Sequence, residues 1–570
     1  MKKIAILIGA VALGLNTYSQ IGLVSGQIGT SVDTYLSRTV PFGFSGAVLV
    51  AQDGQILLNK GYGYADRSNK IENTIASVFS TGSLTKQFTA AAIMKLEMMG
   101  KINTDDKLGK YFENLPLNKQ DITLYHLLTH TSGLPLAFSE DDFKPISKDE
   151  YLKKSMIAKS EFEPGAEFKY SNVGYVLLAM IIEKVSGLSY EEFLQKYLFK
   201  PAGMSQTGYA IPKWKEEDFV HIYNGNNDNG TTALFTRPTW HLIGNGGILS
   251  TTNDMFKWIV ALNGNSILSE DAKTKMFTPF KNDYGFGWDV LDDGNLRQHN
   301  GGSLLGNGAE LRWFVHEKLV TVIFTNSTID GEMGFEVVRN ELEALTMGDT
   351  IPLPPEIKTV SKDFTPYQGK YQIPSGATFT INVSDGEAKL LVENQEILDL
   401  LIDPENYKEG GSNVELNKKF ENAFSKALRT EDFSGFDFTG APEDLKNEIN
   451  NELKLEGIEN PYFKVVRTIP SHNSKDLKIT QVALSTNKDF QGASLKLSIV
   501  TDNEKYAGIG VDFGFVDPIS LGIYPVGGNN FQLYDLQAKF GAKMAVTKTG
   551  NGTYTFSFGN RTITAIKKID

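Results

Sequence analysis

VFSTGSLTKQFTAAAIMKLEMMG, residues 78–100, combines the pattern of a helix with a reactive residue pair at its start. Phe88, Ala91 and Met98 belong to an apolar series that recurs every three to four positions, which is typical of a buried helix. Gly100 follows, and glycine tolerates the left-handed backbone at which many helices end. The stretch therefore predicts a core helix that ends near Gly100.

A serine and a lysine stand three positions apart at the start of this helix. Ser83 and Lys86 would share one helical face, so the amine could hydrogen-bond the hydroxyl. A hydroxyl beside an amine at the positive end of a helix is typical of an activated nucleophile. The alternative is a helix N-cap with a solvated lysine. A second Ser-x-x-Lys match begins at Ser485 without such a helix behind it, so the pair alone does not decide between them.

Strand patterns occur on both sides of a largely helical region. Residues 44–64 alternate around a turn at Asp53, which predicts a tight hairpin. Residues 176–185 and 255–262 are apolar runs with helical spacing. Strand-like segments return between residues 284 and 324. This order predicts an α+β domain whose antiparallel sheet is built from both ends, with helices flanking it and a helical region inserted.

A proline cluster, residues 352–355, is the expected end of this domain. Beyond it, residues 379–383 and 388–392 alternate like strands, and residues 416–455 have the pattern of two amphipathic helices. From residue 463 the chain is again rich in strand patterns. The second region is therefore predicted to be β-rich with helices in its middle.

The composition is that of an ordinary globular protein. The 570 residues are 41% apolar and 22% charged, which suits two or three domains. The formal charge is -12 and no basic cluster occurs, so we expect no nucleic-acid partner. The sequence contains no cysteine, which excludes disulfides, thiolate metal sites and a cysteine nucleophile.

The N-terminus has the pattern of a secretory signal peptide, which we assign to residues 1–19. Lys2 and Lys3 precede an apolar run at residues 4–15, and small and polar residues follow. A membrane anchor is the alternative, but the run is shorter than the ~20 residues that cross a bilayer. We therefore expect a periplasmic or extracellular protein without a stable membrane span.

Two short motifs supply candidate partners for Ser83. Tyr170-Ser171-Asn172 stands where a turn gives way to a helix, so its phenol and amide could project into a cleft. His299-Asn300-Gly301 precedes a glycine-rich strand, where backbone can approach a ligand closely. Each has an ordinary structural alternative, namely a capping asparagine with a half-buried tyrosine and a lone surface histidine.

Motifs of other enzyme classes are absent from the sequence. His126 and His130 have the i, i+4 spacing of a zinc helix, but Leu127 replaces the glutamate of H-E-x-x-H. No G-x-S-x-G elbow and no G-x-x-x-x-G-K-[ST] loop occurs. We therefore predict no metal and no cofactor.

Taken together, Ser83-x-x-Lys86, Tyr170-x-Asn172 and His299-x-Gly301 resemble the active-site elements of the serine β-lactamase and penicillin-binding-protein-like hydrolases. Class C β-lactamases, D-peptidases and related esterases share this layout. The segments LLTHTSGLP, FKYSNVGY, GGILSTTNDM and YGFGW are similar to the framework of that family. The resemblance extends over residues 44–326 and favours the nucleophile at Ser83 over the helix cap.

The resemblance implies a role for each motif. Ser83 would form an acyl-enzyme, with Lys86 or Tyr170 as the base that takes its proton. Asn172 would hold Lys86 and the substrate amide. The backbone N–H groups of Ser83 and Gly302 would form the oxyanion hole, beside the substrate-binding residues His299 and Gly301.

The third motif departs from the Lys-Thr-Gly of β-lactamases. His299 is mostly neutral near pH 7, so it would hold a substrate carboxylate less strongly than lysine does. We therefore predict an exported serine hydrolase that acts on a small peptide, with D-amino acids, or on an ester. The alternatives are β-lactamase or penicillin-binding activity, and a non-catalytic binding or scaffold protein on the same fold. The sequence does not indicate an oligomeric state.

The resemblance also suggests domain limits. Residues 20–350 would form the hydrolase domain. Residues 351–406 and 516–570 are similar to the two halves of a lipocalin-like β-domain, which leaves residues 407–515 as an inserted α+β module.

Overall fold

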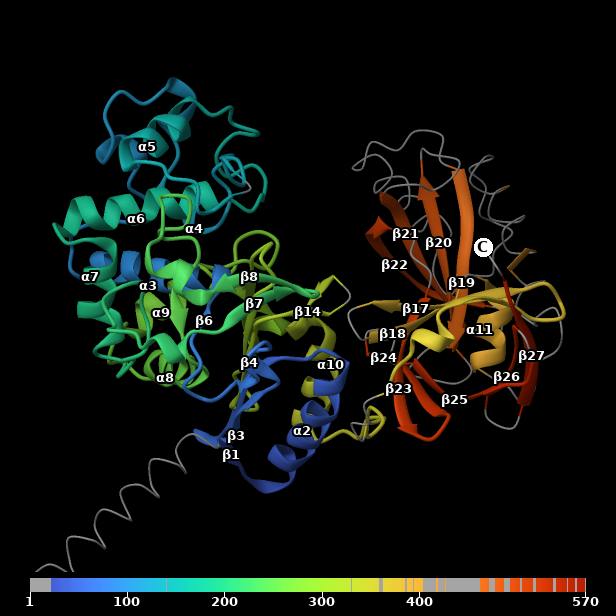
Figure 1. Ribbon diagram of the computed structural model, residues 1–570. Coiled ribbons are helices and arrows are strands. Elements are labelled where there is room, and N and C mark those ends of the chain that lie inside the picture. Colours follow the sequence, from blue (N-terminus) through green and yellow to red (C-terminus); the bar gives the residue numbers. More distant parts are fainter. Residues whose placement is uncertain are drawn as a thin grey trace, which may run out of the picture. The chain divides into compact units, whose positions relative to one another are not determined.

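The computed structural model consists of two units, residues Met1–Leu353 and Pro354–Asp570, and the boundary between them in the sequence falls within the proline cluster (Figure 1). The signal-peptide segment lies outside the described residues, and so does most of the segment 416–455 with its two expected helices. The structure describes residues 22–139, 141–329, 331–357, 362–384, 387–392, 394–402, 417–418, 426, 462–470, 477–485, 493–502, 505–515, 519–536, 540–550, 552–558 and 561–568.

A seven-stranded antiparallel sheet forms the centre of the first unit. The early strands lie beside the late ones, because β2 pairs with β13 along its whole length. The sheet is therefore built from both ends of the domain, as the sequence predicts. In spatial order its strands are β1 (Leu23–Val24), β3 (Gln55–Tyr62), β2 (Gly46–Gln52), β13 (Leu319–Thr325), β12 (Gly308–Phe314), β11 (Leu296–Gly302) and β10 (Asp289–Leu291).

Helices cover both faces of this sheet (Figure 1). Two helices lie against one face, namely α2 (Gly26–Thr39) and α10 (Gly334–Thr346). On the other face, α8 (Thr252–Asn263) packs against β2 and β13, and α3 (Thr85–Met98) packs against α9 (Glu270–Met276). The inserted helical region contains α4 (Leu124–Leu128), α5 (Lys148–Ile157), α6 (Asn172–Ser186) and α7 (Tyr190–Leu194), which a π-helical turn, Gln195–Phe199, continues.

Short strand pairs connect these layers. They are β4 (Tyr64–Asp66) with β5 (Ile71–Glu72), β6 (Phe79–Ser80) with β9 (Leu249–Ser250), β7 (His221–Asn224) with β8 (Asn227–Thr231), and β14 (Thr328–Ile329) with β15 (Glu332–Met333). The β6–β9 pair lies directly before the turn, Gly82–Leu84, that leads into α3.

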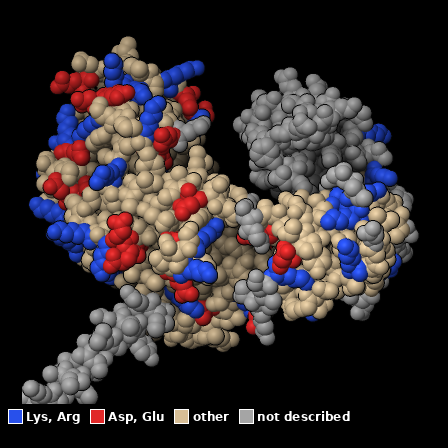
Figure 2. Space-filling view, in the orientation of Figure 1, with Lys and Arg blue, Asp and Glu red and all other residues tan. Residues whose placement is uncertain are grey.

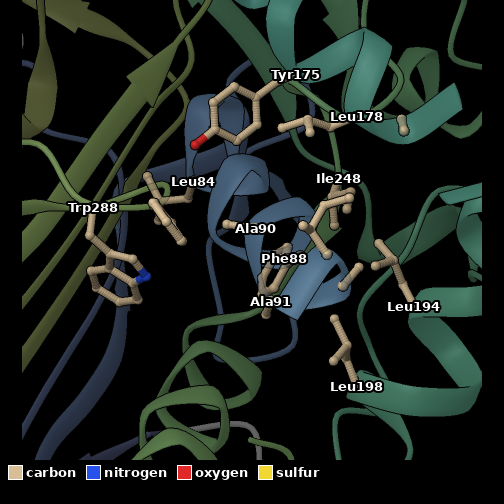
Figure 3. Packing of buried hydrophobic residues seen from close by; sticks show 14 of the residues in the cluster. Leu84, Phe88, Ala90, Ala91, Tyr175, Leu178, Leu194, Leu198, Ile248 and Trp288 are labelled. Atoms are coloured by element: carbon tan, nitrogen blue, oxygen red, sulfur yellow. The ribbon is translucent and has the colours of Figure 1, made fainter. Parts of the chain in front are cut away.

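Helix α3 is the core helix predicted from residues 78–100, and it is buried almost all round. Figure 3 shows its apolar side chains among residues of α6, α7 and the loops before α8 and β10. The Phe88 ring lies 5.0 Å from both Phe199 and Trp258, in edge contacts. Burying one such ring is worth about 2–3 kcal/mol. The start of α3 is therefore held firmly in place.

The second unit contains a closed eight-stranded barrel. Its centre is filled by aromatic side chains, since the rings of Tyr371, Phe379 and Phe556 lie 5.0–5.3 Å apart. Helix α11 (Gln395–Ile402) adds buried leucines to the same core. The barrel strands are β16 (Gly369–Gln372), β17 (Thr378–Ser384), β18 (Glu387–Val392), β23 (Ile519–Gly527), β24 (Asn530–Asp535), β25 (Phe540–Lys548), β26 (Thr553–Phe558) and β27 (Arg561–Lys567).

A separate four-stranded sheet interrupts the barrel between β18 and β23 in the sequence. Its strands are β19 (Tyr462–Pro470), β20 (Leu477–Ser485), β21 (Ala493–Asp502) and β22 (Lys505–Phe515). The predicted fold class, an α+β domain followed by a lipocalin-like β-rich region, is confirmed.

Two surface properties bear on possible partners. Acidic and basic side chains lie interspersed on the face of the first unit that Figure 2 shows. Among the described helices, none is by itself long and apolar enough to cross a membrane. The bent pair Asn172–Ser186 and Tyr190–Phe199 passes that test by length and composition.

Candidate active site

Ser83 lies in a 3₁₀ turn, Gly82–Leu84, directly before α3. Gly82 adopts a φ of +50°, and a Cβ there would come within 2.6 Å of the Gly302 nitrogen. Only glycine meets both conditions without strain. Ser83 is half-buried, so part of its surface remains accessible at the N-terminal end of the core helix.

Lys86 is fully buried one turn further along, with 0% of its surface exposed. Its Nζ lies 3.1 Å from Ser83 Oγ and donates a 2.8 Å hydrogen bond to the carbonyl of Asn245. Burial holds the pKa of Lys86 well below its usual value, and the Asp142 carboxylate opposes this shift only in part. The structure therefore puts an amine that readily becomes neutral beside the hydroxyl of Ser83.

Tyr170 stands over the same pair of residues. Its hydroxyl is hydrogen-bonded to Ser83, and its ring centroid lies 4.7 Å from Lys86 Nζ. Burial raises the pKa of Tyr170, and the hydrogen bond to Ser83 offsets part of this rise. The phenol consequently keeps its proton at neutral pH, which suits a proton donor.

Asn172 is the first residue of α6, and its helix is capped by Ser171 rather than by its own side chain. Its backbone N–H donates a 2.9 Å hydrogen bond to the carbonyl of Leu136. Its Oδ1 is buried and accepts no hydrogen bond from the described residues. Lys86 bonds Ser83 and Asn245 instead, so the described contacts include no Asn172–Lys86 hydrogen bond.

His299 lies on β11 and is 5% exposed. Its Nδ1 is 2.6 Å from the carbonyl of Asn300, which makes Nδ1 the donor. Nε2 is then the acceptor for the Tyr284 hydroxyl at 3.1 Å. Burial and the charge of Lys86 lower the pKa of His299 to about 3. The imidazole is therefore neutral near pH 7.

Gly301 and Gly302 bring β11 against the turn of Ser83. A Cβ at Gly301 would lie 2.1 Å from the Ser83 nitrogen. Both glycines also pair with β12, as Gly301 with Ala309 and Gly302 with Gly308. The backbone of this strand end and the N–H of Ser83 thus lie side by side, where two N–H donors can face one oxygen.

Sequence reasoning predicted Tyr170 but not the rings around it. We call His130, Tyr170, Tyr175 and Tyr284 together the aromatic wall. The ring centroid of His130 lies 4.1 Å from Tyr170, 5.1 Å from Tyr175 and 4.7 Å from Tyr284. His130 Nδ1 accepts a 3.0 Å hydrogen bond from the backbone N–H of Ser171. Contacts with His130 and Tyr284 therefore hold the Tyr170 ring in place, and Lys86 lies over the rings of Tyr170 and Tyr175.

The histidine pair that resembles a zinc helix is not on one helix. Helix α4 ends at Leu128, and His130 adopts a φ of +55°. His126 Nδ1 accepts the backbone N–H of Thr123 at 3.2 Å, which engages it in a helix cap. Within the described ranges, no group of three or more His, Asp or Glu side chains could hold a metal ion.

Asn245 is a further residue that the sequence did not single out. Its carbonyl receives Lys86, and its side chain is fixed by a 2.7 Å hydrogen bond from Nδ2 to the carbonyl of His241. The only available signal was its position directly before Gly246-Gly247. The structure brings together five of the seven predicted site residues, through direct contacts or close backbone approach: Ser83, Lys86, Tyr170, Gly301 and Gly302. The His299 ring lies near Tyr170, with ring centroids 6.2 Å apart. Asn172 is the first residue of α6, the helix that follows Tyr170.

Comparisons with known proteins show what this chain is similar to. A family model described as Beta-lactamase matches residues 43–346. Penicillin-binding protein 4* of Bacillus subtilis (strain 168) is 28% identical over 390 residues, covering 63% of this chain and 86% of that protein. The protein PbpX of the same strain is 32% identical over 304 residues, covering 53% of this chain and 75% of that protein. The structure of the octameric penicillin-binding protein homologue from Pyrococcus abyssi has the same fold, with a TM-score of 0.50 at 18% identity, covering 95% of this chain and 100% of that chain.

Proposed function

Because the chain belongs to the beta-lactamase family and is a serine hydrolase, we propose that it cleaves a small peptide amide or an ester through an acyl-enzyme on Ser83. The observation that carries the proposal is the buried Lys86 amine, 3.1 Å from Ser83 Oγ. The pKa of that amine is lowered by burial, so a fraction of Lys86 is neutral and able to accept a proton.

The geometry favours a division of labour between Lys86 and Tyr170. Lys86 takes the proton of Ser83 as Oγ attacks the carbonyl carbon and the carbonyl oxygen becomes an oxyanion. Tyr170, whose pKa is raised by burial, holds a proton that it can pass to the leaving group. As the bond from the acyl carbon to the leaving group breaks, this proton goes to that group and the acyl-enzyme forms. Water then attacks the acyl carbon and gives one proton to the Tyr170 phenolate. The bond from that carbon to Ser83 Oγ breaks as Lys86 returns its proton to Oγ, and the acid leaves.

The oxyanion is assigned to the backbone N–H groups of Ser83 and Gly302. One such donor is typically worth about 3 kcal/mol in the transition state. The close approach of β11 to the Ser83 turn supports this assignment, since a Cβ at Gly82 would lie only 2.6 Å from the Gly302 nitrogen.

We expect Gly301→Ala to reduce kcat/KM by at least about 10²-fold, because the new Cβ would overlap the Ser83 nitrogen at 2.1 Å. Neither atom belongs to a flexible side chain, so the turn itself must shift. Turnover of p-nitrophenyl butyrate measures the effect. Gly264→Ala is the matched control, since its Cβ would meet only ordinary contacts at 3.8–3.9 Å. Wild-type turnover in Gly301→Ala would contradict the assigned oxyanion hole.

The neutral His299 supports a substrate without a carboxylate near the third motif. A D-amino-acid peptide or an ester fits this better than a β-lactam, whose carboxylate a lysine would hold. The second candidate is β-lactam acylation, which the name of the relative penicillin-binding protein 4* favours. Export to the periplasm or the medium is part of the proposal, on the strength of Lys2, Lys3 and the apolar residues 4–15.

A substrate panel tests the proposed function. We expect the protein that comprises residues 20–570 to turn over p-nitrophenyl esters or D-amino-acid p-nitroanilides and to bind a fluorophosphonate probe covalently. L-amino-acid anilides and a chromogenic cephalosporin complete the panel. Rapid cephalosporin hydrolysis with no ester or anilide turnover would replace the first candidate by the second. Absence of both turnover and labelling would leave a non-catalytic binding protein.

A further inference from the structure

His130 holds the backbone on both sides of Tyr170. Its carbonyl accepts a 2.9 Å hydrogen bond from the N–H of Lys169, which directly precedes Tyr170. Its Nδ1 accepts a 3.0 Å hydrogen bond from the N–H of Ser171, which directly follows Tyr170. The two rings also lie against each other, with centroids 4.1 Å apart and planes inclined by 36°. One residue therefore restrains both the backbone and the ring of Tyr170.

Two features of His130 destabilise the folded protein. Its φ of +55° lies in the left-handed region, which is unfavourable for a residue with a Cβ. Because Nδ1 is an acceptor, Nε2 of the neutral ring carries the hydrogen. This Nε2 is buried and forms no hydrogen bond with the residues that the structure describes, which is a second cost. Strain of this kind is concentrated at functional sites, so His130 is a candidate for a role beyond packing.

The surroundings keep the His130 ring neutral. Burial lowers the pKa of His130 well below its usual value, and a positive charge on Lys86 or His299 lowers it further. Nδ1 therefore stays an acceptor when Lys86 takes up the proton of Ser83. The hydrogen bond that holds the Ser171 N–H consequently persists through the catalytic step.

The position of Tyr170 affects some substrates more than others. Its hydroxyl is hydrogen-bonded to Ser83, which places it beside the bond that breaks. An amide nitrogen or an alkoxide must receive a proton as it leaves, whereas p-nitrophenolate is a stable anion that leaves without one. Misplacing a reacting group by about 1 Å can cost about 10²-fold in rate. Substrates with poor leaving groups are therefore the ones that require a precisely held Tyr170.

We propose that His130 is a positioning residue that holds the Tyr170 hydroxyl in place for proton transfer to the leaving group. Amides and alkyl esters are the substrate class that depends on it. This inference rests on the proposed function and extends it from the reacting groups to their support. As the bond from the acyl carbon to the leaving atom breaks, that atom takes the Tyr170 proton, and the phenolate later regains a proton from water. His130 acts on this step only through Tyr170.

The His130→Asn variant tests the proposal in the whole protein. Asparagine tolerates the left-handed backbone, and its Oδ1 can accept the Ser171 N–H, so the substitution mainly removes the ring. We expect kcat/KM to fall about 10- to 100-fold for ethyl butyrate and for D-alanine p-nitroanilide. For the p-nitrophenyl esters of butyrate and D-alanine, it should fall less than about 3-fold. We compare kcat/KM because it covers the steps up to the acyl-enzyme.

His126→Asn is the matched control. His126 Nδ1 likewise accepts a backbone N–H, that of Thr123 at 3.2 Å, but this bond caps α4. The control should therefore keep the wild-type ratio between the two kinds of substrate. A second variant, His130→Phe, keeps a ring and removes the acceptor, and it should show the same selective loss. Thermal unfolding and fluorophosphonate labelling of Ser83 report whether each variant is folded.

A double-mutant cycle shows whether His130 acts through Tyr170. Tyr170→Phe has no phenolic proton to deliver, so it should itself lose turnover of ethyl butyrate and D-alanine p-nitroanilide. Adding His130→Asn to Tyr170→Phe should lower kcat/KM less than about 3-fold further. A residue with a merely structural role would reduce kcat/KM by the same factor in both backgrounds.

The outcomes separate this inference from the function on which it rests. An equal loss on both kinds of substrate, no loss, or additive losses in the cycle would overturn the role of His130 while Ser83-dependent turnover remained. A complete lack of Ser83-dependent turnover and labelling would overturn the proposed function and this inference with it.

Discussion

The Ser83→Ala variant is expected to lose kcat by about 10⁵-fold or more. The variant lacks the only oxygen that lies both 3.1 Å from Lys86 Nζ and against the Tyr170 hydroxyl in the described site. Without that oxygen no acyl-enzyme can form, and the oxyanion hole alone gives only residual catalysis. Turnover of p-nitrophenyl esters measures the loss, and intact-protein mass after fluorophosphonate treatment measures the missing adduct.

Ser485→Ala is the matched control for this experiment, since Ser485 opens the second Ser-x-x-Lys sequence in the chain. It should retain wild-type turnover and labelling. The Ser83→Ala protein should unfold within a few degrees of the wild type, because Lys86 keeps its hydrogen bond to Asn245. Undiminished labelling of Ser83→Ala would show that the probe reacts at another nucleophile.

The parts of the fold and of the site that could be predicted are those that require particular residue types at particular positions in the sequence. The buried helix after Ser83 has an apolar period that no strand shares, and the hairpin at Asp53 has its turn residues in place. The glycine at 301 is likewise dictated by a close backbone approach. Each of these features can therefore be recognised from the sequence pattern alone.

Other parts of the site depend on contacts that leave no mark in the sequence. The carbonyl of Asn245 receives Lys86, and any residue has such a carbonyl. The spacing of His126 and His130 predicts one helical face, but α4 ends at Leu128 and the chain turns at His130. Asp142 lies in a loop whose position is fixed by Thr239 and Phe235, far along the chain. The positions of Asn245, His130 and Asp142 thus depend on tertiary contacts, which the sequence pattern does not reveal.

Lys86→Met is expected to lower kcat by about 10⁴-fold, the upper range for loss of a general base. Methionine fills a similar volume but cannot accept the proton of Ser83. In the wild type, kcat/KM should rise with pH as Lys86 loses its proton, and that rise should start well below the usual lysine range because burial lowers the pKa. Lys86→Arg should be equally inactive, since a guanidinium stays charged.

The Lys86→Met substitution should also increase the free energy of unfolding. Lys86 is buried without an ion pair among the described residues, and burying a charged amine in this way destabilises the folded state. Methionine removes this destabilisation. It also leaves the Asn245 carbonyl without its hydrogen bond, which costs about 1 kcal/mol. Between the lowered pKa of folded Lys86 and about 10.4 in the unfolded chain, the unfolded state binds more protons. Wild-type stability relative to Lys86→Met should therefore rise with pH across this window and level off above it. Denaturant unfolding of both proteins between pH 6 and pH 10 measures this difference. If Lys86→Met were less stable by an amount independent of pH, Lys86 would titrate like an ordinary lysine and could not serve as the base near neutral pH.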